Sequence, residues 1–162
     1  LGMTVAHAGL AIAIAGMTAS TLFQIEKILA MRPGETVSLR GYDLRFDGVA
    51  EVPGPNYRAE RARFTVTSGG APVVVLQPER RFYPVQRSQT TEAAIHTTGL
   101  ADLYVVTGDS DGKGAWTVRL YHNPLVPWIW AGCIVMALGG ALSLADRRLR
   151  VGAPKRRLAP AE

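Results

Sequence analysis

The sequence opens with LGMTVAHAGLAIAIAGMTASTLFQ (residues 1–24), a stretch that contains no Asp, Glu, Lys or Arg. A second uncharged stretch, HNPLVPWIWAGCIVMALGGALSLA (residues 122–145), lies near the other end. Each is about as long as the ~20 residues that an α-helix needs to cross a bilayer. Together they predict a membrane protein of the α+β class, in which two transmembrane helices flank one water-facing domain.

The 162 residues divide into four expected parts. These are a transmembrane helix (1–24), a β domain (25–122), a second transmembrane helix (123–145) and a basic tail (146–162). The central part has the size of one small domain. Its single-domain length leaves no room for a second soluble core.

Charge orients these parts relative to the membrane. The formal charge is +5, but residues 24–122 carry 12 Lys/Arg against 11 Asp/Glu, whereas the tail nets +4. Short Lys/Arg-rich flanks stay in the cytoplasm, and two spans return the chain to its starting side. We therefore expect a cytoplasmic tail and a periplasmic domain in the bacterial inner membrane. A basic cluster confined to the tail does not indicate a nucleic-acid surface.

The central domain shows the pattern of antiparallel strands. Apolar and polar residues alternate over 42–47 and 63–67, and Gly69-Gly70 joins the second run to a short apolar strand at 73–76. A second hairpin is predicted between 103–107 and 116–121, and only 91–95 has a weak helical pattern. The domain is expected to begin at Pro33-Gly34 and to form a sandwich or small barrel. The predicted core consists of Phe46, Phe64, Val66, Leu76, Val105 and Trp116.

The first span carries a stripe of small residues on one helical face. Its members are Gly2, Ala6, Gly9, Ala13, Gly16 and Ser20. Such faces allow membrane helices to approach closely, so we expect a packed partner helix, one that this chain does not obviously supply. The stripe would also leave room for a flat porphyrin beside it.

His7 flanks this stripe inside the first span. Ionisable groups in hydrocarbon are costly, so His7 is the candidate functional residue. A neutral imidazole at this depth can ligate a haem iron, relay protons or form an interhelical hydrogen bond. Composition alone leaves these three alternatives open and favours the hydrogen bond.

Other candidate sites have simpler interpretations. Asp109–Gly112 resembles a calcium loop, but Leu120 occupies the position of the bidentate Glu, so a hairpin turn is favoured. His96 and His122 have no metal-spaced neighbours, although His122 lies at the membrane edge. Arg80, Arg81 and Arg87, with Phe82 and Tyr83, suit either solvated arginines at a strand end or a docking surface for an anionic partner. The lone Cys133, inside the second span, is interpreted as a small apolar lining residue and excludes a disulfide framework.

The chain also resembles the CcmF/NrfE family of cytochrome c-type biogenesis proteins, the haem lyases of the Ccm pathway. The resemblance begins with GMTVAHAG (2–9), which matches a GMxxAHxG motif at the start of a late transmembrane helix. It continues in order through 31–49, 54–66, 78–96, 102–109 and 124–148.

The resemblance implies a function that neither composition nor spacing supplies. The family takes haem from the haem chaperone CcmE, joins it to the CxxCH motif of apocytochrome c, and works with CcmH and related thiol proteins. It also holds a structural haem b between two transmembrane histidines, of which His7 matches the second. The other histidine, the WWD segment and two periplasmic histidines have no counterpart in this sequence.

A chain that begins Leu1-Gly2-Met3 is expected to be the C-terminal part of a longer multi-span protein, not catalytic alone. A cleaved signal peptide is the rival for residues 1–24, but the apolar run is long and no basic segment precedes it. The alternative function is a non-catalytic, membrane-anchored periplasmic β module that acts as a scaffold or binds a partner.

Overall fold

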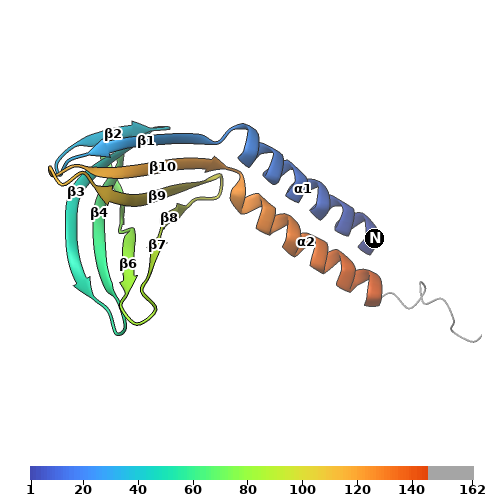
Figure 1. Cartoon of the computed structure of the whole chain (residues 1–162). Coiled ribbons are helices and arrows are strands. Elements are labelled where there is room, and N and C mark those ends of the chain that lie inside the picture. Colours follow the sequence, from blue (N-terminus) through green and yellow to red (C-terminus); the bar gives the residue numbers. More distant parts are fainter. Residues whose placement is uncertain (146–162) are drawn as a thin grey trace, which may run out of the picture.

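In the computed structural model, residues 1–145 are described, and they form two helices and ten strands (Figure 1). The basic tail lies outside the described residues. The helices are α1 (Gly2–Leu22) and α2 (Val126–Ala145). The strands are β1 (Ile25–Met31), β2 (Thr36–Leu39), β3 (Tyr42–Pro53), β4 (Arg58–Ser68), β5 (Ala71–Leu76), β6 (Glu79–Tyr83), β7 (Ser88–Glu92), β8 (Ala94–Thr97), β9 (Ala101–Ser110) and β10 (Trp116–Pro124).

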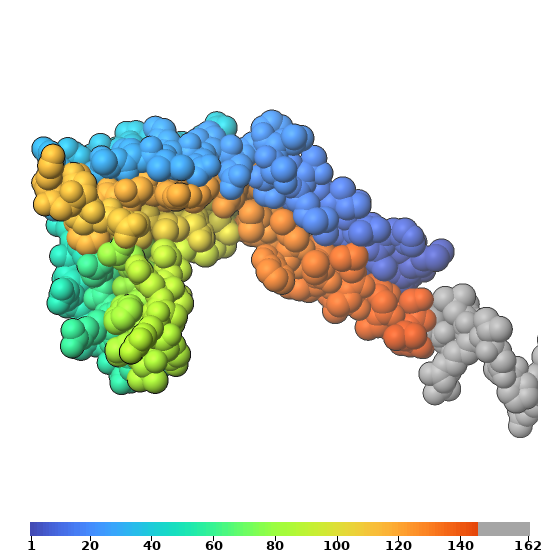
Figure 2. Space-filling view, viewed as in Figure 1, coloured from blue at the N-terminus to red at the C-terminus, as the bar shows by residue number. Residues whose placement is uncertain are grey.

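Both helices are long and apolar enough to cross a membrane. They lie side by side and project from one end of the β domain (Figures 1 and 2). All the strands lie between them in sequence, so the predicted arrangement of two apolar helices around a β domain is confirmed. The second helix begins at Val126, because β10 continues as strand to Pro124.

The strands form two antiparallel sheets. The first has the order β1-β10-β9-β8, and the second has the order β2-β3-β4-β6-β7, with β5 also paired to β4. The two predicted hairpins are present as β4–β5 and β9–β10. Gly69 and Gly70 both have positive φ (56° and 81°), which glycine adopts without steric cost and which suits them to the β4–β5 turn.

The core fills the space between the sheets. Its centre is the stacked pair Phe46 and Phe64, whose ring centroids are 5.0 Å apart. The predicted core residues Phe46, Phe64, Val66, Leu76 and Val105 are buried. Trp116 is only partly buried, because it begins β10 beside a register shift that interrupts the alternation with Val118.

Two local expectations were wrong. The strands begin at Ile25, where the β domain was expected to start, and not at Pro33-Gly34, because β1 is held by pairing with β10. Residues 91–95, the weak helical stretch, lie in β7 and β8, where neighbouring strands override local propensity.

The joint between helices and sheet is short and bonded. β1 starts three residues after α1 ends, and Ile25 pairs with His122 of β10. Gln24 Nε2 donates a hydrogen bond to Asn123 Oδ1 over 2.8 Å. Leu125, with a φ of 57°, turns the chain into α2. No flexible linker separates the β domain from its helices in the described chain.

The β8–β9 loop is also tied to α2. The Leu125 N–H donates to the Leu100 carbonyl over 2.7 Å, and Trp128 Nε1 donates to the Gly99 carbonyl over 3.0 Å. Aromatic residues at a span end are typical of a membrane interface. Trp128 is therefore placed where an interface is expected, and it ties a loop of the β domain to the first turn of α2.

Candidate functional site

The small-residue stripe of α1 packs against α2 of the same chain. A Cβ on Gly9 would lie 2.5 Å from the Met136 backbone nitrogen, and one on Gly132 would lie 2.5 Å from that of Ala13. A Cβ on Gly2 would lie 2.5 Å from the Ser143 nitrogen, one on Gly16 would lie 2.9 Å from Ile129, and Gly139 of α2 faces Ala6. Such distances are possible only because side chains are missing at the contact. The expectation that the partner helix lies outside this chain was therefore wrong.

His7 lies on the opposite face of α1. Its side chain is exposed, whereas Gly9 and Ala13 on the stripe are buried. The large apolar residues around it, Met3 and Leu10, are 67% and 44% exposed. Because α2 occupies the stripe, the expectation that a porphyrin would fit along it was also wrong. Any group that binds His7 has to approach from the outer face of the helical pair.

A hydrogen bond fixes the chemistry of the His7 ring. Nδ1 lies 2.7 Å from the Met3 carbonyl oxygen. A carbonyl can only accept, so Nδ1 carries a proton, and in the neutral imidazole Nε2 keeps its lone pair. Histidines that ligate metals commonly have their other ring nitrogen held in this way by a carbonyl. The imidazole is thus arranged to offer Nε2 outward from α1 as a nitrogen donor of the kind that metal ions bind.

The other two histidines lie in the β domain, far along the chain from His7. His96 and His122 both pair with Leu103, on β8 and β10, so one strand separates them. Burial lowers the pKa of His122, and the nearby Arg40 charge lowers it further. Its Nδ1 is buried without a hydrogen-bond partner in the described chain. No group of three or more metal-binding side chains occurs among residues 1–145.

The basic-aromatic stretch is an internal ion-pair network. Arg80 donates to Glu60 over 2.6 Å and also pairs with Asp109. Arg81 pairs with Glu79 over 2.8 Å and lies over the Tyr57 ring, 4.7 Å from its centroid. The interpretation of these two as solvated arginines was wrong, because they are only 19% and 29% exposed. Their charges bind the domain's own carboxylates.

Network geometry also explains the ionisation of Glu79. Burial raises the pKa of the Glu79 carboxyl, but hydrogen bonds from Arg81 and Arg61 outweigh it and hold the pKa below its usual range.

The Asp109–Gly112 segment is the turn that was favoured. There Asp111 Oδ1 accepts from the Lys113 and Ala115 amides over 2.7 and 2.9 Å.

Sequence reasoning missed one groove on the β domain. It lies beside β9 and β10 and includes Thr107 and Arg119, neither of which stands out by residue type or spacing. Only the strand pairing brings these residues together with Thr91 of β7, so no local signal in the sequence indicates them.

Three comparisons place the chain among known proteins. Residues 22–124 match the family model described as the CcmF C-terminal beta-sandwich. The chain is 45% identical over 166 residues to cytochrome c-type biogenesis protein CycK of Bradyrhizobium diazoefficiens, covering 99% of this chain and 25% of that protein. It is 43% identical over 159 residues to cytochrome c-type biogenesis protein CcmF of Escherichia coli, covering 98% of this chain and 25% of that protein.

A solved structure of a protein named Cytochrome c Heme Lyase CcmF has the same fold. It superposes with a TM-score of 0.71 at 23% identity, over 89% of this chain and 24% of that chain. The chain thus spans about a quarter of the length of the relatives it matches.

Proposed function

Because the chain belongs to the CcmF family and corresponds to the C-terminal region of its members, we propose that it contributes a histidine ligand, His7, to a membrane-embedded haem b. The longer protein would be an inner-membrane haem lyase that attaches haem to apocytochrome c. This chain would supply two of its transmembrane helices and a periplasmic β domain. Alone it would not catalyse the reaction.

The observation that carries the proposal is the geometry of His7. Its Nδ1 is held by the Met3 carbonyl, and its Nε2 is free on the face of α1 that α2 leaves uncovered. Met3, Leu10 and Ile14 surround it with an apolar surface, which keeps water from an iron–imidazole bond. A haem held there would supply a redox-active iron, and the remaining segments of the longer protein would cover its other side.

The β domain would face the periplasm, where apocytochrome c and its haem donor meet. The net charge of +1 for residues 24–122 against +4 for the tail supports this orientation. The proposed partners are the haem chaperone CcmE, CcmH and related thiol proteins, and apocytochrome c. Reporter fusions at Gly69 and after residue 150 should report opposite sides of the membrane.

The experiment is substitution of His7 in the full-length protein. His7→Ala should lose the b-type haem absorption and cytochrome c maturation together, while the protein still inserts. His96→Ala is the matched control, because it removes an imidazole from the β domain, and it should keep the haem spectrum. His7→Cys offers a thiolate to the iron and should retain haem with an altered potential. An unchanged spectrum in His7→Ala would show that His7 forms only a structural hydrogen bond.

A further inference from the structure

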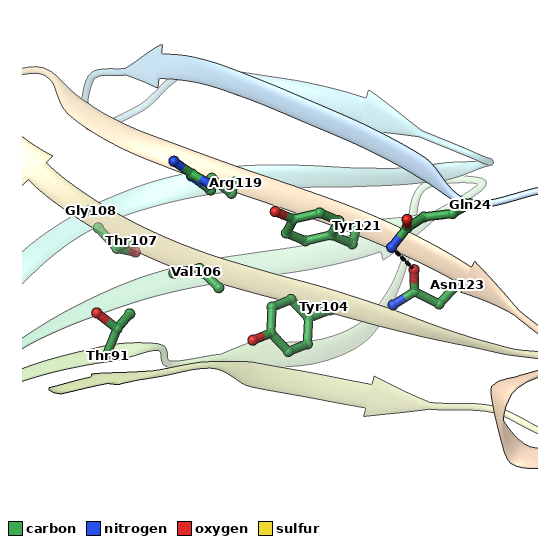
Figure 3. A pocket seen from close by; sticks show the side chains of 9 residues that line it. All are labelled: Gln24, Thr91, Tyr104, Val106, Thr107, Gly108, Arg119, Tyr121 and Asn123. Atoms are coloured by element: carbon green, nitrogen blue, oxygen red, sulfur yellow. Dashed lines mark hydrogen bonds between the residues drawn. The ribbon is translucent and has the colours of Figure 1, made fainter. Parts of the chain in front are cut away.

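A groove of about 570 Å³ lies along the outer side of β9 and β10 (Figure 3). It runs from Gln24 and Asn123, next to the helices, past Tyr104 and Tyr121 towards Thr107. The two tyrosine rings meet edge to face, with centroids 5.5 Å apart. Grooves of this volume are large enough to hold a ligand.

The groove follows an edge of β9 to which no strand of the described chain is hydrogen-bonded, although Arg80 of β6 forms an ion pair with Asp109 there. β8 pairs with β9 only over residues 102–105 of β9. In contrast, β10 pairs with β9 as far as Ser110. Beyond this point the chain leaves for the other sheet, where β7 pairs with β6. Over residues 106–110, β9 therefore has a ladder partner on one side only in the described chain.

The groove lining itself shows that the edge is open. Val106, Thr107 and Gly108 all line it, although consecutive strand residues point to opposite faces of a sheet. This lining is expected where a groove reaches around the edge of a strand. Thr91 of β7 forms the opposite wall (Figure 3).

One buried polar group in this groove lacks a partner. Thr107 is 3% exposed, and its Oγ1 forms no hydrogen bond within residues 1–145. Leaving a buried hydroxyl unsatisfied costs about 1–3 kcal/mol, so such groups usually have a partner. A ligand in the groove would provide one.

The groove also has a single charged side chain, Arg119. No ion pair to Arg119 occurs among the described residues. The Glu26 carboxylate, on the neighbouring strand β1, accepts a hydrogen bond from the Tyr121 hydroxyl over 2.8 Å. Arg119 also interacts with the Tyr121 hydroxyl, and its guanidinium has further N–H donors for a carboxylate of a ligand.

We propose that this groove binds an extended polypeptide segment, which adds as a strand to the free edge of β9 between Val106 and Ser110. Strand addition uses backbone hydrogen bonds for affinity and side-chain pockets for selectivity. The segment would complete the hydrogen bonding of Thr107, place apolar or aromatic groups on Tyr104 and Tyr121, and set a carboxylate against Arg119.

The segment belongs to an unfolded, haem-free cytochrome c polypeptide, an identification that rests on the proposed function. Such a chain has no native structure and therefore has its backbone free for pairing. The groove begins at Gln24, 17 residues from His7 along the sequence, which is ~25 Å of helix and chain. The groove would hold the polypeptide at the membrane surface without touching the His7 site.

The test measures binding of a fluorescent, cysteine-alkylated, haem-free cytochrome c polypeptide to the full-length protein in nanodiscs. Thr107→Val removes the unpartnered hydroxyl at nearly constant shape, and Arg119→Gln removes the charge. Each should raise the Kd about tenfold. Arg63→Gln, on β4 away from the groove, is the matched control and should leave the Kd unchanged. All three variants should keep the b-type haem spectrum, which separates this proposal from the assignment of His7.

A photo-crosslinking residue at position 91 should attach to the polypeptide, and the same residue at position 63 should not. Binding that is equally tight in Thr107→Val, Arg119→Gln and Arg63→Gln would overturn the proposal. So would a crosslink from position 91 to a segment of the longer protein outside residues 1–145, because the edge of β9 would then already have a strand of its own.

Discussion

Gly139 and Gly140 offer a matched pair of substitutions in α2. A Cβ on Gly139 would lie 2.7 Å from Ala6 Cα and 2.9 Å from Ala6 Cβ, whereas one on Gly140 would meet nothing within 4 Å. Both changes to alanine improve helix propensity by ~1 kcal/mol, so this effect cancels in the comparison. What remains is the contact with α1, one residue from His7.

The cost of Gly139→Ala follows from the distances. Carbon atoms pack at about 3.5–4.0 Å, so the helices would have to separate by about 1 Å near Ala6. A gap of this size removes about a quarter to a half of each contact, and about thirty atom pairs worth ~0.15 kcal/mol each give a loss of ~1–2 kcal/mol. We expect Gly139→Ala to be less stable than Gly140→Ala by this amount.

Thermal unfolding of the detergent-solubilised full-length protein, followed by tryptophan fluorescence, measures this difference. If His7 binds haem, Gly139→Ala should also release haem at a lower temperature than Gly140→Ala. Equal melting temperatures, or a higher one for Gly139→Ala, would refute the packing of the two helices through their small residues.

Three further predictions concern the β domain and its joint. Phe64→Ala should destabilise the domain by ~3–5 kcal/mol, because Phe64 is fully buried, whereas Val75→Ala, at a side chain 42% exposed, should change stability by less than ~0.5 kcal/mol in chemical denaturation. Trp128→Phe removes the donor to the Gly99 carbonyl and should cost ~0.5–1.5 kcal/mol, seen as faster hydrogen exchange of the Ala101 amide with no change in the core strands. The lowered pKa of Glu79 means that its ion pairs stabilise the fold above about pH 4.5 and that this contribution is lost as the pH falls further. Glu79→Gln should therefore flatten the acid side of the plot of unfolding free energy against pH. A plot as steep as that of the unmodified protein would disprove the assignment.

Local patterns predicted the features whose cause is local. The two uncharged stretches predicted both helices, and the turn glycines with flanking alternation predicted the β4–β5 and β9–β10 hairpins. β1 was missed because Glu26 and Lys27 interrupt its apolar residues, and only its pairing with β10, about a hundred residues later, holds it as a strand.

The candidate sites also divide into features that the local sequence indicates and features that depend on tertiary structure. His7 stands out in the sequence because it is an ionisable residue in an apolar run. That His7 lies across α1 from the small-residue stripe follows from the helical repeat, whereas the covering of this stripe by α2 of the same chain is a tertiary property. The groove at Thr107 depends on the point where strand pairing changes from β8 with β9 to β7 with β6, and no residue type indicates that point.

The short joint between α1 and β1 makes the chain sensitive to length at this place. One residue inserted at Phe23-Gln24 would have to be accommodated either by a rotation of α1 or by a shift of β1. As a rotation of α1 by about 100°, it would turn Gly9 off α2 and move His7 to a new side of the helix. As a slip of β1, it would send every side chain of that strand to the opposite face of the sheet. The joint therefore couples the rotational position of the α1 helix, which repeats every 3.6 residues, to the alternating faces of the β1 strand, which repeat every two. At this place the number of residues matters more than their identity.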